Sequence, residues 1–423
     1  MIMKIVMANM EKPGYTGSLA DYQAAGGYTA LRKALKDMSP DQVIEEVKKS
    51  GIRGRGGAGF PAGVKWGFIP KDSDKPRYLI NNADEGEPGT FKDRVIMTRD
   101  PHMTIEGNII ASYAIKCNVS YIYIRGEFYH EAKILERAIR EAEEAGILGD
   151  NILDSGFSHR VYVHRGAGAY VCGEETGLIE SIEGKRGQPR VKPPFPAIVG
   201  LFDCPTVVNN TETLANIPYI INNGGSEYAK IGVERGTGTK IYAISGHVKN
   251  PGLFEFPMGI SLRELIYEHA GGIRNDNQLK GIIPGGSSMP VLTADEIDVN
   301  MDFDSLQKIG SALGSAAVIV MDETVCMVDA CLNLTRFYAH ESCGQCTPCR
   351  EGMPWMNKIV DRIEHGKGEE GDIDLLLNIT DNIEGRTICA FGEAGAWPVR
   401  AFAKKFRSEF EEHIKQKKCP FKS

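Results

Sequence analysis

The chain has 423 residues, a formal net charge of −7 and an isoelectric point near 5.8. This length exceeds one ordinary hydrophobic core and predicts two to four domains. Basic residues are spread along an acidic chain, which makes nucleic acid a poor candidate partner, and the absence of an apolar run of about eighteen residues predicts no direct membrane insertion. Ten cysteines without regular spacing are typical of a reducing compartment, where thiolates are free to bind metal.

A glycine-rich loop follows the first well-marked helix. Ser39-Pro-Asp-Gln42 has the pattern of a capped helix start, and the helix is expected to run to Lys49. The next segment, Gly54-Arg-Gly-Gly-Ala-Gly59, matches G-x-G-x-x-G, but it follows a helix instead of a strand, and Phe60-Pro61 stands where a Rossmann helix should begin. The ordinary dinucleotide fold is therefore rejected.

The same loop still favours a ligand site. Its small residues allow backbone N–H groups to form a concavity that holds an anion, and Arg53, Arg55 and Lys65 are expected to add positive charge. The alternative is a flexible surface loop. The aromatic residues nearby favour a nucleotide base and are Phe60, Trp66 and Phe68.

Acidic residues follow a predicted buried strand, Tyr78–Asp84. Asp84, Glu85 and Glu87 lie at its carboxyl end, where α/β proteins place side chains that bind ribose or ribityl hydroxyls. A solvated turn would have the same composition. The phosphate-type loop just upstream favours a functional interpretation.

Helices and strands alternate through residue 182. Helices are expected at 102–117 and 128–145, and strands at 121–125 and 160–164. The second strand runs into a glycine-rich stretch, 166–177, which opens a helix through Ile182, and this context suits a phosphate or an isoalloxazine ring.

A proline-rich segment, 184–205, is too stiff for a helix and should wrap the surface. The segment after it offers two amides, Asn209 and Asn210, and the Thr213 hydroxyl ahead of a helix. These groups suit a bound heterocycle, or else Asn210 or Thr211 caps the helix.

A change of composition near Gly236 marks a second domain. Strands are expected at 239–248, 254–256 and 318–321, around a short helix opened by a capping box at Ser261-Leu-Arg-Glu264. This pattern predicts a small β-grasp domain. From residue 329 the chain is expected to be helical, with helices at 329–342, 353–364, 372–383 and 393–416.

Three cysteines in seven residues, Cys343, Cys346 and Cys349, lie on the loop between the first two of these helices, and Cys389 is the nearest downstream fourth ligand. An iron–sulfur cubane or a zinc ion requires such a set. His340 and His365 do not have zinc-site spacing, which favours the cubane. The remaining cysteines of this region lack companions and are Cys326, Cys331 and Cys419.

A cluster accepts one electron at a time, so a nicotinamide donor would need a flavin between donor and cluster. Two glycine-rich loops in the first half suit one flavin phosphate and one pyrophosphate. A scaffold that uses the cluster structurally and the loops only as turns is the alternative from another class.

Four motifs together resemble a known family. The chain contains, in order, Gly54-Arg-Gly-Gly-Ala-Gly-Phe-Pro-Ala-Gly63, Asn82-Ala-Asp-Glu-Gly-Glu-Pro-Gly89, Gly168-Ala-Tyr-Val-Cys-Gly-Glu-Glu-Thr176 and Glu341-Ser-Cys-Gly-Gln-Cys-Thr-Pro-Cys-Arg350. They look like the family of flavin-bearing, NADH-binding 51 kDa subunits of respiratory NADH:quinone oxidoreductase (complex I). Similar subunits occur in NAD-linked hydrogenases and formate dehydrogenases, which makes a diaphorase subunit the second choice.

The resemblance implies NADH as substrate, one FMN and one [4Fe–4S] cluster. Around FMN it implies Gly54, Arg55, Gly56, Gly57, Lys65, Asn82, Asp84, Tyr170, Gly173, Glu174, Asn209, Asn210 and Thr213. Around NADH it implies Gly57, Ala58, Gly59, Phe60, Phe68, Glu85, Glu87, Glu175, Lys192 and Phe195. The implied cluster ligands are Cys343, Cys346, Cys349 and Cys389. No side chain is expected to transfer a proton; Glu87 and Glu175 would position the nucleotide.

The implied architecture is α/β with three domains. Residues 1–235 form a Rossmann-like but non-standard flavin and NADH domain, 236–325 a β-grasp (ubiquitin-like) domain, and 326–423 a four-helix bundle with the cluster. The implied partners are a thioredoxin-like [2Fe–2S] subunit of the 24 kDa type and the peripheral arm of complex I. The implied location is cytoplasmic, on the inner face of the bacterial membrane through partner subunits, or on the matrix side in mitochondria.

Overall fold

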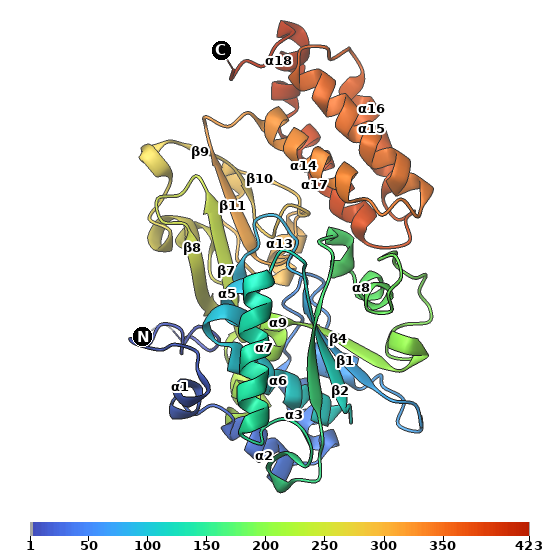
Figure 1. Ribbon diagram of the computed structural model, residues 1–423. Helices are drawn as coiled ribbons and strands as arrows, with labels where there is room; N and C mark the ends of the chain where they lie inside the picture. The colour runs from blue at the N-terminus through green and yellow to red at the C-terminus, as the bar shows by residue number, and fades with distance from the viewer. Residues whose placement is uncertain (1–2, 423) are drawn as a thin grey trace.

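The computed structural model describes residues 3–422. An amino-terminal unit with a parallel sheet lies at one end of the molecule, and the C-terminal helices lie at the other (Figure 1). A second sheet lies beside both of them. Within the described residues, no helix combines the length and the hydrophobicity needed to cross a membrane.

The amino-terminal unit contains a four-stranded sheet in which all neighbouring strands are parallel, in the order β3-β2-β1-β4. Its strands are β1 (Tyr78–Ala83), β2 (Val119–Ile124), β3 (Arg160–Arg165) and β4 (Thr206–Asn210). The predicted strands at 78–84, 121–125 and 160–164 are confirmed within two residues. Strand β4 was expected only as a polar segment ahead of a helix, because its two asparagines are poor strand formers.

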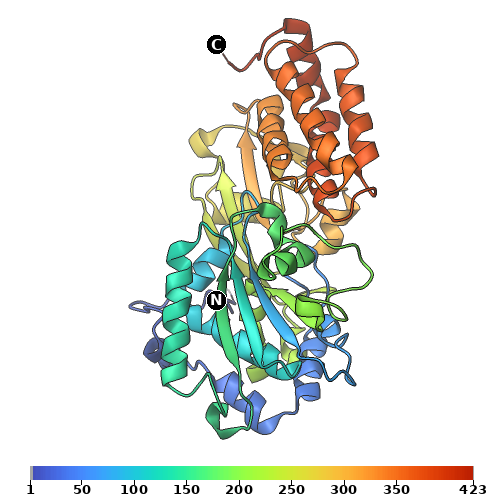
Figure 2. The same ribbon diagram turned by 45° about the vertical axis from the view of Figure 1, so that its right-hand side comes forward.

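Helices cover this sheet on both faces. Its helices are α1 (Leu19–Ala24), α2 (Thr29–Asp37), α3 (Pro40–Ser50), α4 (Ala62–Trp66), α5 (Lys92–Arg99), α6 (Pro101–Ala114), α7 (Tyr129–Glu144), α8 (Glu175–Ile182), α9 (Thr211–Ala215), α10 (Ile217–Asn223) and α11 (Gly225–Tyr228). Figure 2 shows the teal α7 on one side of the strands and the green α8 on the other. The predicted cap of α3 is confirmed, because Ser39 and Gln42 exchange backbone and side-chain hydrogen bonds.

The two faces of the sheet belong to different hydrophobic cores. Side chains alternate along a strand, so Leu79 enters the core beneath α6 whereas Ile80 faces the opposite core. The second core is continuous from Ile80 and Val208 to Cys349 and Phe391 among the C-terminal helices. The C-terminal helices are therefore packed onto the amino-terminal unit through a shared apolar interior.

A middle unit follows the short hairpin of β5 (Gly232–Val233) and β6 (Gly236–Thr237). Its five-stranded sheet has the order β10-β9-β11-β7-β8, and β7 and β11 are parallel at its centre. Its elements are β7 (Thr239–Gly246), β8 (Gly252–Pro257), α12 (Leu262–Glu264), β9 (Leu279–Ile283), β10 (Leu292–Thr293), α13 (Phe303–Lys308) and β11 (Ala317–Asp322). The expected capping box at Ser261 is wrong: the Ser261 side chain makes no cap, and α12 passes directly into a π-helical turn, Leu265–His269.

The C-terminal helices are α14 (Met327–Glu341), α15 (Thr347–Glu364), α16 (Asp372–Ile383), α17 (Phe391–Lys405) and α18 (Arg407–Gln416). Two expectations need correction. Helix α15 begins at Thr347, so Cys349 lies in its first turn and not on the loop. The expected helix 393–416 is two helices, because Phe406 leaves helical geometry at φ −113° and ψ 27° while its ring packs on Phe402.

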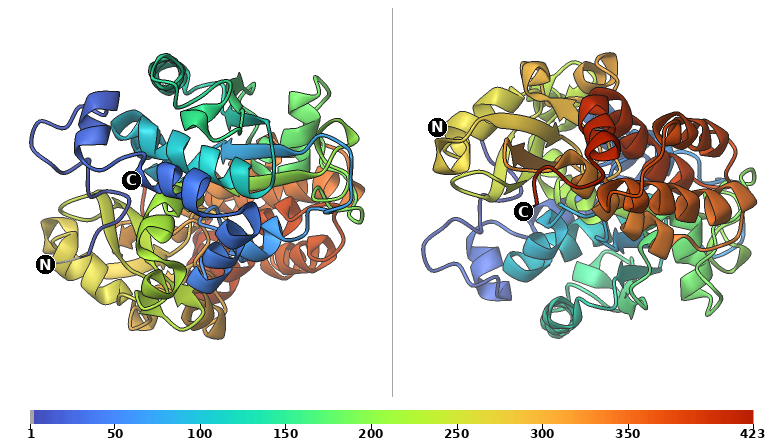
Figure 3. Two further views of the ribbon diagram at one scale, coloured as in Figure 1. Left: turned by 90° about the horizontal axis from the view of Figure 1, so that it is seen from below. Right: turned by 90° about the horizontal axis from the view of Figure 1, so that it is seen from above.

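Ion pairs connect the C-terminal helices to the middle unit. Lys405 pairs with Glu296 at 2.6 Å, and Glu409 pairs with Lys280 at 2.7 Å. Seen from above, the orange and red helices lie beside the yellow strands of the middle unit (Figure 3). The three units therefore pack against one another and do not form a linear array.

Candidate functional site

Most of the predicted site residues lie at the carboxyl edge of the parallel sheet. The segments after β1, β3 and β4 all start there, because parallel strands end at the same edge. The glycine-rich loop reaches this edge as well. The Arg55 N–H donates to the Thr213 hydroxyl at 2.8 Å, and a Cβ built on Gly56 would come 2.9 Å from Cβ of Asn210.

The glycine-rich loop, residues 54–60, is closed by a bond from the Gly54 N–H to the Phe60 carbonyl at 2.9 Å. Gly59 has φ +64°, and a Cβ there would come 2.4 Å from the Phe303 ring of the middle unit. Gly57 has φ +137° and open space within 4 Å of an added Cβ. The loop therefore has one crowded side and one side on which a ligand can approach its backbone.

Two of the three cations expected to line this loop are engaged by other groups of the protein. The Arg55 guanidinium is fully buried and donates to the carbonyls of Thr237 at 2.6 Å and Thr239 at 3.0 Å. Arg53 lies 3.8 Å over the Phe303 ring and donates to the Gly59 carbonyl. Both arginines therefore fasten the loop to the middle unit through their guanidinium groups, and the expectation that they add positive charge to a ligand site stays a prediction.

Lys65, on α4, is the third cation expected beside the glycine-rich loop, and both it and Lys192 contact the Glu175 carboxylate. Glu175 accepts from Lys65 at 3.3 Å and from Lys192 at 2.9 Å, and Lys192 also pairs with Glu174 at 2.9 Å. Burial alone would raise the pKa of Glu175, but the two ammonium groups outweigh burial and lower it. Glu175 is therefore ionised at neutral pH and holds the proline-rich segment against α4.

One strand-end carboxylate, that of Glu85, has a structural role in the protein. Glu85 is buried, and its oxygens accept the backbone N–H groups of Asp93 at 2.8 Å and Arg94 at 3.0 Å at the start of α5. Its carboxylate is thus occupied as a helix cap. Asn82 donates to the Gly173 carbonyl at 2.9 Å and thereby joins the loops after β1 and β3.

Asp84 lies at the same strand end in a poorly solvated position. Burial raises the pKa of Asp84 to about 7; Arg125 opposes this, and Glu127 and Glu341 add to it. The carboxyl of an unfolded aspartate titrates near pH 3.9. The folded state therefore binds more protons between about pH 4 and pH 7, and an ionised Asp84 costs stability that grows as pH rises through this window.

Asp84→Asn should accordingly raise the melting temperature of the cofactor-free chain by more at pH 8 than at pH 5. Differential scanning calorimetry of the variant and the parent at both pH values measures this difference. Asp41→Asn, which removes an exposed carboxylate on α3, is the matched control. A gain that is equal or larger at pH 5 would contradict the burial of an ionisable Asp84.

Glu87 and Tyr170 connect all three units. The Tyr170 hydroxyl donates to Glu87 at 2.5 Å, and the backbone N–H of Ser288 in the middle unit donates to the other Glu87 oxygen at 2.7 Å. The Tyr170 N–H donates to Glu341 at the end of α14 at 3.0 Å, and its ring packs edge-on against Phe391 at 5.8 Å. The loop after β3 thus contacts the helix ends that flank the four cysteines.

Three predicted aromatic residues stand exposed beside this edge. Phe60 and Phe68 flank α4 with ring centroids 5.9 Å apart, and they are 44% and 53% exposed. Phe195 on the proline-rich segment is 57% exposed. Large apolar side chains with this exposure contribute little to folding, so they are available to a ligand.

The four predicted cluster cysteines converge where α14 ends, α15 begins and α17 begins. Burial, with smaller contributions from neighbouring thiols of the set, raises the pKa of Cys349 to about 12 and that of Cys389 to about 11. Four cysteine sulfurs gathered in one place are the ligand set that an iron–sulfur cluster requires.

The cysteine site directly adjoins the loops at the sheet edge. The Gln188 side chain donates to the Cys343 carbonyl at 3.3 Å, and Glu174 is one of the charges that raise the pKa of Cys389 after burial itself. Sequence reasoning missed Gln188, Glu341 and Ser288, because their contacts span more than 150 residues. It also missed Arg125, which donates to the Glu85 carbonyl at 2.8 Å; its position directly after β2 was the available signal.

Three family models match the chain. The Nuo51 FMN-binding domain matches residues 47–219, the SLBB domain 240–320, and the NADH-ubiquinone oxidoreductase-F iron-sulfur binding region 329–413. The first and third models cover the two halves of the candidate site. They agree with FMN and a [4Fe–4S] cluster as the cofactors.

Solved structures share the fold. The chain of an NAD⁺-reducing [NiFe]-hydrogenase in the air-oxidized state matches with a TM-score of 0.84 and 34% identity, covering 98% of this chain and 67% of that one. The same enzyme in the H₂-reduced state gives 0.83 and 35%, covering 93% of this chain and 65% of that one. The chain thus spans about two thirds of these hydrogenase chains.

Curated relatives are more similar in sequence. The NADH-quinone oxidoreductase F-subunit 2 of Rhizobium meliloti (strain 1021) is 54% identical over 422 residues, which is 100% of both chains. The NADH-quinone oxidoreductase F-subunit of Rickettsia massiliae (strain Mtu5) is 56% identical over 384 residues, 90% of this chain and 91% of that protein. The chain therefore belongs to the family of NADH-quinone oxidoreductase F-subunits.

Proposed function

We propose that this protein is the electron-input subunit of an NADH:quinone oxidoreductase. It binds FMN at the carboxyl edge of the parallel sheet, oxidises NADH there, and passes electrons through one [4Fe–4S] cluster toward quinone. The observation that carries this proposal is the direct contact of the loop after β3 with the cysteine-bearing helices, through Tyr170, Glu341 and Phe391. Family membership supports the same function.

The FMN site is assigned to the glycine-rich loop and the sheet edge. The open side of Gly57 supports the fit, because an added Cβ would fill space into which a phosphate can enter. Arg55 can contribute its main chain. The proposed FMN residues are Gly54, Arg55, Gly56, Gly57, Lys65, Asn82, Asp84, Tyr170, Gly173, Glu174, Asn209, Asn210 and Thr213.

The NADH site is assigned to the outer side of the same loop. The exposed rings support an adenine site, and Glu87, already held by Tyr170 and Ser288, supports a site for ribose hydroxyls. Glu85 stays in the set only as a neighbour, since its oxygens cap α5. The proposed NADH residues are Gly57, Ala58, Gly59, Phe60, Phe68, Glu85, Glu87, Glu175, Lys192 and Phe195.

Catalysis by this chain is positioning. When bound, FMN accepts a hydride from NADH and releases electrons singly. The protein fixes the positions of the side chains around the nucleotide. Glu175, for example, holds Lys65 and Lys192 by ion pairs with its carboxylate. Glu87 is anchored by hydrogen bonds from Tyr170, Ser287 and Ser288, and its negative charge disfavours the additional phosphate of NADPH.

The cluster ligands are proposed to be Cys343, Cys346, Cys349 and Cys389. The raised pKa values of Cys349 and Cys389 mean that these two residues are neutral thiols without the cluster, so iron must supply the charge that ionises them. Ser342 lies 3.1 Å from the Cys349 sulfur and would support that ligand.

We further propose the three domains 1–235, 236–325 and 326–423. A β-grasp assignment for the second is supported by the order β8-β7-β11-β9-β10 with its central parallel pair. A four-helix bundle for the third is supported by α14, α15, α16 and α17, each of which packs on at least two of the others. The proposed partners are the thioredoxin-like 24 kDa [2Fe–2S] subunit and the peripheral arm, on the cytoplasmic face of the bacterial membrane.

A diaphorase subunit of an NAD-linked hydrogenase is the second candidate, favoured by the structural matches to such an enzyme. Affinity purification of the tagged chain from its native host separates the two. Co-purification with a quinone-reducing complex supports the proposal, whereas co-purification with a hydrogenase supports the second candidate. Cofactor-loaded protein without NADH–ferricyanide activity would contradict both.

Phe195→Ala should raise KM for NADH roughly 3- to 10-fold with little change in kcat, because the stacking contact of one aromatic ring is lost. NADH–ferricyanide kinetics of the cofactor-loaded chain measure the change. Tyr162→Ala on β3 removes another ring, 49% exposed, and is the control. Loss of FMN with an unchanged KM for NADH would contradict the assignment of Phe195 to the nucleotide.

A further inference from the structure

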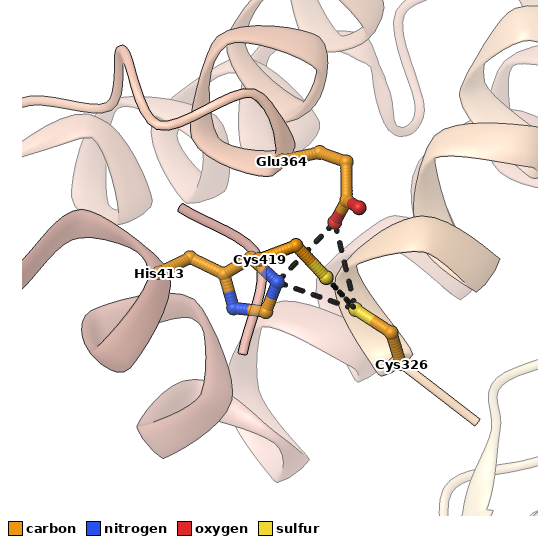
Figure 4. A group of neighbouring side chains, drawn as sticks. All are labelled: Cys326, Glu364, His413 and Cys419. Atoms are coloured by element: carbon orange, nitrogen blue, oxygen red, sulfur yellow. Dashed lines mark hydrogen bonds and ion pairs between the residues drawn. The ribbon is translucent and has the colours of Figure 1, made fainter. Parts of the chain in front are cut away.

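A second group of metal-ligating side chains lies at the opposite end of the C-terminal helices from the cluster cysteines. Cys326 caps the start of α14, Glu364 ends α15, His413 lies on α18, and Cys419 follows α18 (Figure 4). The cluster cysteines adjoin the other ends of α14 and α15. The fifteen residues of α14 separate the two groups by about 22 Å.

The four ligand atoms form a compact buried set. All lie within 4.8 Å of one another, and their residues are between 0% and 6% exposed. The two sulfurs are 3.7 Å apart, and the Cys326 sulfur lies 3.3 Å from His413 Nε2 and 3.5 Å from Glu364 Oε2. His413 Nε2 lies 3.3 Å from the same Glu364 oxygen.

The four separations given above match those of tetrahedral zinc. With Zn–S bonds of about 2.3 Å and Zn–N or Zn–O bonds of about 2.0 Å, the ligand separations are about 3.8 Å for S to S, about 3.5 Å for S to N or O, and about 3.3 Å for N to O. A disulfide would bring the sulfurs to about 2.05 Å. The observed separation between Cys326 and Cys419 matches shared coordination and not a covalent bond.

Neighbouring groups favour the binding of a cation by these four residues. The Nδ1–H of His413 donates to the Glu409 carbonyl at 2.7 Å, which leaves Nε2 as the free lone pair. The Asp329 N–H at the start of α14 donates to the Cys326 sulfur at 3.4 Å. Two thiolates and a carboxylate around Zn²⁺ leave one negative charge, and Lys422 lies 3.0 Å from Glu364 to balance it.

The geometry points to a structural Zn²⁺ site made by Cys326, Glu364, His413 and Cys419, separate from the iron–sulfur cluster. Four protein ligands leave no open position, which is typical of structural zinc. A surface pocket of about 380 Å³ has Cys326 and Lys422 in its wall and gives the ion an entry path. The zinc ion fastens the segment after α18 to the start of α14 and the end of α15.

The test is metal analysis of the full-length, cluster-loaded chain after removal of loosely bound metal with a chelator. The parent protein should contain about one zinc per chain besides its iron. His413→Ala and Cys419→Ser should each lower zinc at least tenfold and leave iron unchanged. Cys331→Ala, a buried thiol on α14 outside the set, and His365→Ala, next to Glu364, should keep both metals.

Two further measurements decide the case if these variants fail to fold. His413→Cys retains a zinc ligand and should restore zinc binding, and the parent protein loaded with Co²⁺ should show thiolate-to-cobalt charge-transfer and tetrahedral d–d bands. Only trace zinc in the parent, full zinc in folded His413→Ala, or a Cys326–Cys419 disulfide in protein alkylated before air exposure would overturn the site. None of these outcomes depends on NADH oxidation.

Discussion

Cys389→Ala is expected to remove the cluster, about four iron atoms per chain, while FMN stays bound. Cys389 comes from the segment ahead of α17, whereas the other three ligands come from the α14–α15 junction, so its loss leaves a cluster without its fourth protein ligand. The FMN residues lie on other segments. Iron analysis and flavin absorbance of the purified variant measure the two cofactors separately.

The loss of the cluster should affect the two enzymatic activities differently. NADH–ferricyanide activity, which needs only flavin, should persist, whereas NADH–quinone activity of the assembled complex should fall to background. Cys204→Ala, another buried thiol that is free in the structure, is the control and should retain iron and both activities. A variant that keeps its full iron content would show that Cys389 is not the fourth ligand.

Gly57→Ala is expected to lower FMN affinity more than tenfold. The methyl group would enter the open side of the glycine-rich loop, where we propose that the phosphate approaches the backbone. The positive φ of +137° adds strain of about 1–3 kcal/mol. FMN dissociates when the protein is diluted, and the rise in flavin fluorescence gives the dissociation constant directly.

Strain alone must be separated from the loss of the ligand space. Gly149→Ala provides this control, because Gly149 also has positive φ, +104°, and open space around an added Cβ, but it lies at the amino end of β3. Both variants should melt earlier than the parent, and only Gly57→Ala should lose FMN. Equal FMN affinity in the two variants would contradict the assignment of the glycine-rich loop to the flavin site.

The sequence predicted the parts of the fold that local patterns determine. The capped start of α3 and the strands β1, β2 and β3 followed from capping residues and from runs of β-branched and aromatic side chains. Motif order pointed to the family. Helix boundaries near Cys349 and Phe406 were wrong, because packing in the interior decides where those helices begin and end.

The directions in which these side chains point could not be predicted from the sequence. Arg55 and Glu85 both belong to the motifs. The Arg55 guanidinium, however, donates to carbonyls of the middle unit, and the Glu85 carboxylate accepts N–H groups at the start of α5. Cys326 and Cys419 were interpreted as thiols without companions, although they meet at 3.7 Å across 93 residues of sequence. Such long-range pairings leave no spacing pattern to read.

The contact between the sheet-edge loops and the cysteine-bearing helices is tested most directly by freeze-quench EPR of the cofactor-loaded chain mixed anaerobically with NADH. We predict that flavin absorbance bleaches and that the signal of a reduced [4Fe–4S] cluster forms in the same protein, and that Cys389→Ala shows bleaching alone. A fully assembled cluster that stays oxidised while the flavin is reduced would contradict electron transfer from the sheet edge to these cysteines.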